Sequence, residues 1–325
     1  MPPFWACERT RPASGYSRAR PRASPRCRAV DTRPPRSQAI HLGVPSGRPT
    51  VTPLLAVDGH HLLYRSWWGF TERRITSRDG RRDLTGVFGF LAILRKTHLE
   101  QAPGHEIVVV FDGENAAASR RSKDPGYKAD RVVADHSPIQ SLPLVKDGLD
   151  VAGVSWIELE GHEGDDVIAA LARTATRAGR TVTCYSGDRD LYQLASEQVT
   201  VLTPARRRIT PGEVHARHGV LPRQWPDLRA LTGDASDNIP GVRGIGPKTA
   251  AGLLADGLHL EQLRHSTRLH RPRCRPIAES WEQILTWRDM IRLDHRIPLP
   301  AGLTTSTPTT PLPRAAAVLE DLHLW

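Results

Sequence analysis

The sequence predicts an α/β fold in which helices cover a mostly parallel sheet, followed by a smaller helical region. Three observations support this: short apolar runs alternate with helix-like segments, acidic residues follow several of those runs, and short helices and tight turns replace the pattern after about residue 205. The predicted strands are Leu54–Val57, Ile107–Phe111, Val154–Ile157, Val182–Tyr185 and Val199–Leu202.

Helical segments are predicted over Gly86–Leu99, roughly Ile139–Val151, and Glu163–Ala178. In parallel sheets covered by helices, ligands bind at the carboxyl ends of the strands. Asp58, Asp112 and Asp188 each stand just after a predicted strand. We therefore expect their carboxylates to lie at one edge of one sheet.

The chain of 325 residues divides into four segments by composition. Residues 1–50 are rich in Arg and Pro and are predicted to form a disordered basic tail, most simply explained by an overextended start codon. Residues 51–205 form the α/β part, with a long polar connector at about 114–136, residues 206–300 form the helical region, and 301–325 form a C-terminal tail.

The formal charge of +10 is weak support for a nucleic-acid partner. Residues 1–50 contain ten Arg against only Glu8 and Asp31, so the remaining chain is close to neutral. No apolar stretch approaches the roughly 18 residues of a membrane span. The four cysteines have no CxxC spacing, which disfavours a zinc site or a disulfide framework and suits a reducing cytoplasm.

Acidic residues gather in two further places, EGDD at 163–166 and GDRD at 187–190. Each group alone is equally well explained by helix capping or by the helix dipole, which is worth about 0.3–1 kcal/mol. Together the acids would repel, by roughly 3 kcal/mol for one pair 6 Å apart at an effective dielectric of 20. Divalent cations remove that penalty, and an oxygen-only donor set indicates Mg²⁺ or Mn²⁺ and phosphate chemistry.

The segment GVRGIGPKTA at 241–250 predicts a tight turn at Gly244 and Gly246, followed by a helix that starts near Pro247. Its backbone N–H groups and Lys248 suit a sequence-independent contact with a DNA phosphate. A plain packing turn between two helices explains the same residues when they are taken in isolation.

Seven motifs in order resemble the bacterial 5′→3′ exonuclease and flap endonuclease family, found as the amino-terminal domain of DNA polymerase I or as a free-standing protein. The resemblance covers about residues 53–300 and includes DGHHLLYR at 58–65, VFGF at 87–90, VVVFDG at 108–113, YKADR at 127–131, LEGHEGDDVIAALA at 159–172, SGDRDLYQL at 186–194 and LTGDASDNIPGVRGIGPKTA at 231–250. It implies a PIN-like fold and a Mg²⁺-dependent 5′-3′ exodeoxyribonuclease that also cuts flaps.

The resemblance implies two metal ions. One would be surrounded by Asp58, Asp112, Glu163 and Asp165, and the other by Asp165, Asp188, Asp190 and Asp237, with Asp166 and Asp234 as supporting or shared acids. Lys128 and Arg131 match basic residues at the base of the family's helical arch, here about 114–136, and Arg65 and Arg120 match further DNA contacts. The helix-three-turn-helix motif, which commonly holds K⁺, matches Gly241, Val242, Gly244, Ile245, Gly246, Lys248 and Thr249.

The implied partners are DNA with 5′ ends, flaps or nicks, RNA primer–DNA hybrids, and a DNA polymerase I that this activity complements, for a monomer at the bacterial nucleoid. The arch departs from the family pattern at Asp124, Pro125 and Gly126, which disfavour continuous helix. Unlike the fused relatives, this protein is expected to carry no polymerase domain. Two other functions stay open: a Mg²⁺ phosphatase or phosphoacceptor domain, and a catalytically inactive protein that binds branched DNA.

Overall fold

The computed structural model describes residues 51–70, 74–129 and 137–325. The predicted basic tail at 1–50 lies outside the described residues. Six strands form one sheet in the order β3-β2-β1-β4-β5-β6. They are β1 (Leu54–Asp58), β2 (Glu106–Asp112), β3 (Ser155–Leu159), β4 (Val182–Tyr185), β5 (Val199–Leu202) and β6 (Arg208–Ile209).

The first five strands pair in parallel, which confirms the predicted fold class, and β6 pairs antiparallel with β5. The two-residue β6 was not predicted because it is too short to carry an alternating pattern. Side chains alternate between the two faces with the period of two that strands impose. In β1, Leu54 and Ala56 join one apolar core while Leu55 and Val57 join the other.

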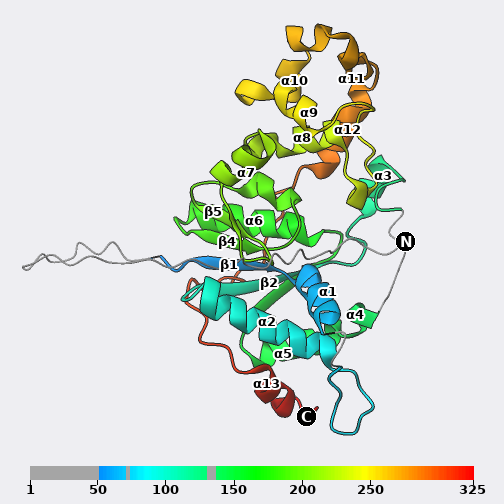
Figure 1. Cartoon of the computed structure of the whole chain (residues 1–325). Helices are drawn as coiled ribbons and strands as arrows, with labels where there is room; N and C mark the ends of the chain where they lie inside the picture. Colours follow the sequence, from blue (N-terminus) through cyan, green and yellow to red (C-terminus); the bar gives the residue numbers. More distant parts are fainter. Residues whose placement is uncertain (1–50, 71–73, 130–136) are drawn as a thin grey trace, which may run out of the picture. The chain divides into compact units, whose positions relative to one another are not determined.

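Helices cover both faces of the sheet (Figure 1). On one face lie α1 (Gly59–Gly69), α2 (Thr85–Gln101), α5 (Leu142–Val151) and α13 (Ala315–Asp321), and on the other lies α6 (Gly164–Arg177). α3 (Ala118–Lys123) and α4 (Ser137–Gln140) flank residues 130–136, which are outside the described part of the chain. None of the described helices is long and apolar enough to cross a bilayer.

The helical region contains α7 (Pro211–His218), α8 (Trp225–Thr232), α9 (Pro247–Leu253), α10 (Leu260–Leu263), α11 (Arg275–Glu279) and α12 (Trp281–Ile291). α8 packs on both α9 and α12, and Trp225 of α8 and Ile284 and Trp287 of α12 are buried. Short 3₁₀ turns occur in both parts: Asp190–Leu194 lies between β4 and β5, and Ala235–Asp237 lies between α8 and α9. The predicted change to short helices after residue 205 is confirmed.

The segment predicted as a C-terminal tail packs against the α/β part. Thr309 Oγ1 accepts a hydrogen bond from the backbone N–H of Ile107 at 2.8 Å, and the Leu312 carbonyl accepts one from Arg95 Nε at 2.9 Å. Val318 and Leu319 of α13 are buried against α2 and α5. Leu312 and α13 are therefore an integral layer of this core, because their apolar side chains cover a helix face that would otherwise meet water.

Candidate active site

The carboxyl edge of the sheet brings Asp58 and Asp112 together, because these residues end the neighbouring parallel strands β1 and β2. Asp58 caps α1 by accepting the His61 N–H at 2.9 Å, and its other oxygen accepts Ser186 Oγ at 2.6 Å. Asp112 Oδ1 accepts the backbone N–H of Gly164, the first residue of α6, at 2.6 Å. Each carboxylate is thus oriented by a neighbouring element.

Four carboxylates act on one another at this edge, namely those of Asp58, Asp112, Asp165 and Asp188, which we call the edge cluster. Burial raises the pKa of Asp58 to about 7, and repulsion from Asp112 and Asp188 adds to it, against the hydrogen bonds from Ser186 and His61. Burial, then repulsion from the other three acids, raises the pKa of Asp165 well above its usual range. The sheet topology therefore concentrates negative charge as predicted.

A second acidic group continues from Asp188 towards the helical region. Burial raises the pKa of Asp190 to about 7, and Asp188, Asp234 and Asp237 add repulsion. The Trp225 indole opposes this shift by donating to Asp190 Oδ1 at 3.0 Å. Because Asp188 influences both Asp58 and Asp190, the two acidic groups are electrostatically continuous.

Glu163 has basic and phenolic partners. Lys128 Nζ lies 2.8 Å from Glu163 Oε1, and Arg120 donates to Oε2 at 2.7 Å. The Tyr127 hydroxyl lies 3.1 Å from Glu163 Oε2 and 3.3 Å from Asp237 Oδ2. Glu163, which was expected to lie beside Asp58, therefore pairs with basic residues at the base of the arch. The Tyr127 hydroxyl connects it to Asp237 of the second acidic group.

Asp166 and Asp234 were predicted as supporting or shared metal ligands, but their oxygens are engaged in contacts that hold the fold. Both oxygens of Asp166 accept from Arg120, and Oδ1 also accepts the Asp294 N–H at 2.9 Å. Burial would raise the pKa of Asp234, but hydrogen bonds from Ser236 and Arg229 outweigh it and lower the pKa. Ion pairs and hydrogen bonds within the protein thus occupy both of these acids.

The donor chemistry of the edge cluster fits a hard divalent cation, since its oxygen donors repel one another while Asp58, Asp165 and Asp188 are half-buried and Asp112 is open to solvent. Over residues 51–70, 74–129 and 137–325, no three His, Cys, Asp or Glu side chains stand ready-made in a metal-holding arrangement. Hydrogen bonds from the protein itself orient Asp58, Asp112 and Glu163.

The turn at 241–246 is built as predicted, with α9 starting at Pro247. Gly241 and Gly244 have φ of 69° and 80°, the left-handed region that favours glycine. Val242 and Ile245 are buried, and their backbone N–H groups donate to the Leu231 and Val242 carbonyls, so both residues anchor the turn. Gly246 and Lys248 are exposed, and Thr249 is half-buried.

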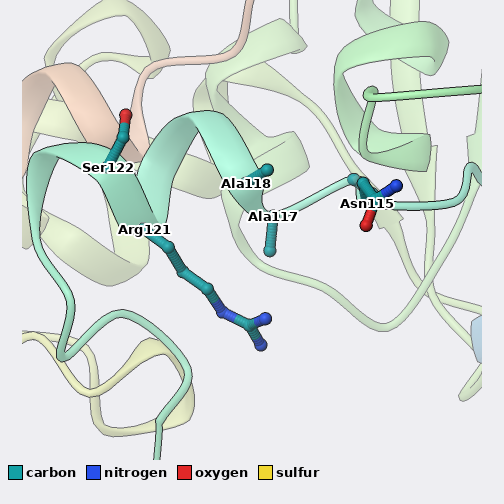
Figure 2. Close-up of a pocket in the computed structure, with 6 residues that line it drawn as sticks. Asn115, Ala117, Ala118, Arg121 and Ser122 are labelled. Carbon is teal, nitrogen blue, oxygen red and sulfur yellow. The ribbon is translucent and has the colours of Figure 1, made fainter.

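The remaining predicted DNA contacts differ in position. Arg65 is exposed on α1, whose first turn is capped by Asp58. Arg120 is only 9% exposed and its contacts are internal, because two carboxylates and a carbonyl surround its guanidinium. Arg131 lies outside the described residues. Figure 2 shows the neighbouring Arg121 extending from α3 beside a hollow lined by Asn115, Ala117, Ala118 and Ser122.

Sequence reasoning missed three residues that shape the site: Tyr127, Ser186 and Trp225. Tyr127 stands beside Lys128 in the YKADR motif, and Ser186 begins the SGDRD motif, so adjacency to predicted site residues was an available signal. Trp225 lies 35 residues from Asp190 in the chain, and no local pattern links the two.

Family models match most of the chain. The 5'-3' exonuclease N-terminal resolvase-like domain matches residues 53–219, and the 5'-3' exonuclease C-terminal SAM fold matches residues 220–313. The chain belongs to the 5′-3′ exonuclease family. The thermostable DNA polymerase I of Thermus filiformis is 39% identical over 273 residues, 83% of this chain and 32% of the relative. The chain thus spans about a third of that relative's length.

Solved structures of nucleases share the fold of this member of the 5′-3′ exonuclease family. The flap endonuclease of bacteriophage T5, in a pseudo-enzyme-product complex with DNA and metal ions, matches 75% of this chain and 89% of its own, with a TM-score of 0.59 and 20% identity. The catalytic core of Rad2 in complex with DNA substrate matches 85% and 89%, with a TM-score of 0.53 and 13% identity. These neighbours support the PIN-like α/β architecture.

Proposed function

We propose that this protein is a structure-selective 5′-3′ exonuclease and 5′-flap endonuclease that hydrolyses DNA phosphodiesters with two divalent cations, Mg²⁺ or Mn²⁺. The observation that carries the proposal is the edge cluster, where burial and mutual repulsion raise the pKa values of Asp58 and Asp165. Such repulsion costs the fold stability, and bound divalent cations would offset it.

The residues proposed to hold the cations form two overlapping sets: Asp58, Asp112, Glu163 and Asp165, and then Asp165, Asp188, Asp190 and Asp237. Bound divalent cations activate a water and stabilise the leaving oxygen in phosphodiester hydrolysis. Ser186 and the Gly164 N–H orient Asp58 and Asp112 through the hydrogen bonds described above. Trp225 orients Asp190 in the same way.

Lys128 is proposed to steer the scissile phosphate, together with Arg131. Its ammonium group is 2.8 Å from Glu163 and 4.0 Å from Asp237, so it lies beside two of the acids proposed to hold the cations. A phosphate brought to the acids would offer this ammonium a new anionic partner. Arg65 on α1 is proposed to contact a further phosphate beside the edge cluster.

Duplex binding is proposed for the turn at Gly241–Gly246, where Gly244, Gly246 and the following Lys248 are exposed to solvent. Backbone carbonyls of this turn are proposed to hold K⁺. The complexes of the bacteriophage T5 flap endonuclease and of Rad2 with DNA support a DNA substrate for a protein of the same fold.

In the cell, we propose a monomer at the bacterial nucleoid that removes RNA primers or flaps and assists repair beside a DNA polymerase I. Relatives of this chain include bacterial DNA polymerases I, which supports that setting. The test uses a 5′-labelled flap and a nicked duplex, each with Mg²⁺ and with EDTA. Mg²⁺-dependent short 5′ products are expected. Tight binding of both substrates without cleavage in Mg²⁺ or Mn²⁺ would favour the alternative, an inactive binder of branched DNA.

A further inference from the structure

Two consecutive arginines on α3 have different surroundings. Arg121 is exposed and has no ion pair within the described residues, whereas Arg120 is 9% exposed and fully surrounded by acceptors. Sequence reasoning assigned Arg120, and not Arg121, to a DNA contact. The structure buries the assigned arginine and exposes its neighbour.

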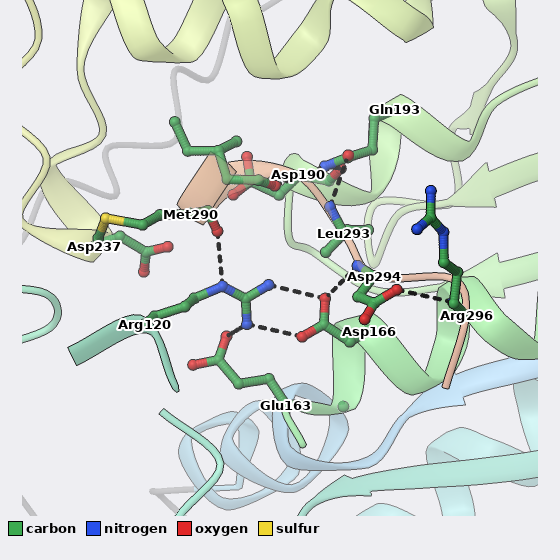
Figure 3. Close-up of polar contacts among 12 residues, drawn as sticks. Arg120, Glu163, Asp166, Asp190, Gln193, Asp237, Met290, Leu293, Asp294 and Arg296 are labelled. Carbon is green, nitrogen blue, oxygen red and sulfur yellow. Dashed lines mark hydrogen bonds and ion pairs between the residues drawn. The ribbon is translucent and has the colours of Figure 1, made fainter. Parts of the chain in front are cut away.

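The guanidinium of Arg120 joins three parts of the chain (Figure 3). Its Nε donates to the Met290 carbonyl near the end of α12 at 2.7 Å. Its two terminal nitrogens donate to both oxygens of Asp166 at 2.8 Å, and one of them also donates to Glu163 at 2.7 Å. Asp166 in turn accepts the backbone N–H of Asp294.

These contacts orient the first turn of α6. Glu163 is the N-cap residue of this helix and has no side-chain capping hydrogen bond, so Arg120, Tyr127 and Lys128 orient its carboxylate instead. In the sequence, Asp165 of the edge cluster lies between Glu163 and Asp166, the two residues whose carboxylates accept hydrogen bonds from Arg120. A shift of this guanidinium would therefore move proposed ligands of both cation sets.

We infer that Arg120 is a positioning residue that fixes Glu163 and Asp165 for the reaction and ties the base of the arch to the helical region, without contacting DNA itself. The inference rests on the proposed function. The planar fork of a guanidinium can engage a carboxylate with two parallel N–H donors, and a lysine ammonium cannot reproduce that geometry. The role should therefore be specific to arginine.

The test compares Arg120→Lys with Arg121→Lys, a matched pair that keeps the charge at both positions. Three quantities are measured: affinity for a flap duplex in Ca²⁺, the single-turnover cleavage rate in Mg²⁺, and Ca²⁺ affinity of the DNA-free protein by calorimetry. Arg120→Lys should lose about 10- to 100-fold in cleavage rate and in Ca²⁺ affinity, as supporting contacts to metal ligands usually do, with DNA affinity unchanged. Arg121→Lys should change neither the cleavage rate nor Ca²⁺ affinity.

The inference would be overturned if Arg120→Lys kept its Ca²⁺ affinity and its cleavage rate on bound DNA but lost DNA affinity. That is the behaviour expected of a residue that contacts a phosphate. Asp166→Asn provides a second test, because it weakens the same contact with little change of shape. If the two residues share one contact, the double variant Arg120→Lys/Asp166→Asn should lose a smaller factor in cleavage rate than the product of the two single-variant factors. A loss equal to that product would contradict a shared contact.

Failure of the proposed function would look different. If the parent protein leaves the flap and the nicked duplex uncut, the nuclease proposal fails, whatever the variants do. If the parent cuts and Arg120→Lys matches it in both rate and Ca²⁺ affinity, only the positioning role fails. Thermal melting of each variant in EDTA shows which proteins are folded. Arg120→Lys and Asp166→Asn test the positioning role independently, so either variant that melts cooperatively decides it.

Discussion

The two ends of the same sheet treat buried charge in opposite ways. At the amino end, Glu106 begins β2 and pairs with Arg180 at 2.6 Å, with both side chains almost wholly buried. The backbone carbonyl of Thr52 also accepts from Arg180, and Thr305 Oγ1 donates to Glu106. The pair fixes the C-terminal segment against the strand ends.

At the carboxyl end, the acids of the edge cluster face one another. Burial raises the pKa values of Asp58 and Asp190 to about 7, a sign that ionising them costs free energy. The same sheet thus stabilises a buried charge at one end and concentrates unfavourable charge at the other. A charge that its surroundings satisfy serves the fold, and a charge that they leave unfavourable marks a site for a ligand.

The largest effect is expected from Asp188→Asn, because Asp188 is the acid that links the two acidic groups. Cleavage should fall by at least about 1,000-fold, roughly 4 kcal/mol of transition-state free energy, while DNA affinity in Ca²⁺ stays within a factor of about two. Folding should persist, and stability in EDTA should hold or rise as repulsion is relieved. Gel-based cleavage and melting curves test both halves, and parental activity in this variant would refute the ligand role.

The opposite end of the sheet should respond in stability alone. Arg180→Met leaves Glu106 buried without its cation, which typically costs about 3–5 kcal/mol of unfolding free energy. Urea unfolding measures this loss. The folded fraction should cut a flap at the parental rate per molecule, since the pair is remote from the acids. A stable variant with impaired cleavage would break the comparison between the two ends.

Lys128→Ala tests the contact between the arch base and Glu163. Losing one preorganised cation beside the reacting phosphate should reduce single-turnover cleavage by about 100-fold, roughly 3 kcal/mol. Duplex affinity in Ca²⁺ should change little, because the turn at 241–246 is proposed to hold the duplex. Reduced affinity with an unchanged cleavage rate would reverse the assigned roles.

Gly246→Val tests the turn itself. An added Cβ at Gly246 meets no atom within 4 Å, and its φ of −84° suits any residue, so folding should be unaffected. A valine there would keep a phosphate from the backbone, and duplex affinity should fall about 10-fold, roughly 1.4 kcal/mol. Gly252→Val also meets open space within α9 and serves as the control. Equal duplex affinities for Gly246→Val and Gly252→Val would argue against the turn as the duplex-binding site.

The sequence was sufficient for the fold class and most of the carboxyl edge. All five predicted strands are present, because buried parallel strands read as short apolar runs with an acid at the end. Parallel pairing then requires Asp58 and Asp112 to meet at one edge. The same reasoning locates α6, whose predicted bounds differ from Gly164–Arg177 by one residue at each end.

Side-chain partners could not be read from the sequence, since they depend on contacts between distant segments. In the sequence, Arg120 looks like a DNA contact because it is a basic residue in a polar connector. In the structure, however, its guanidinium donates to the carbonyl of Met290, which lies 170 residues away. Asp166 resembles its neighbour Asp165 in sequence, yet helix geometry turns it towards Arg120 and away from the edge cluster. The local sequence pattern therefore identifies candidate acids, but it does not distinguish the acids that would bind a cation from those that pair with other side chains.

The smallest effect concerns pH. Because the pKa of Asp190 is about 7 in the folded protein and near 3.8 in the unfolded chain, folding takes up a proton between those values. Its contribution to stability is complete below about pH 4 and is lost as pH rises through 7. The melting temperature in EDTA should therefore decline more from pH 5 to 8 in the parent than in Asp190→Asn, whose amide oxygen still accepts from Trp225. Asp147→Asn, on the exposed side of α5, should keep the parental slope. Identical slopes for Asp190→Asn and the parent would show that this carboxylate ionises freely, and the carboxyl end of the sheet would then lack the stored repulsion that distinguishes it from the amino end.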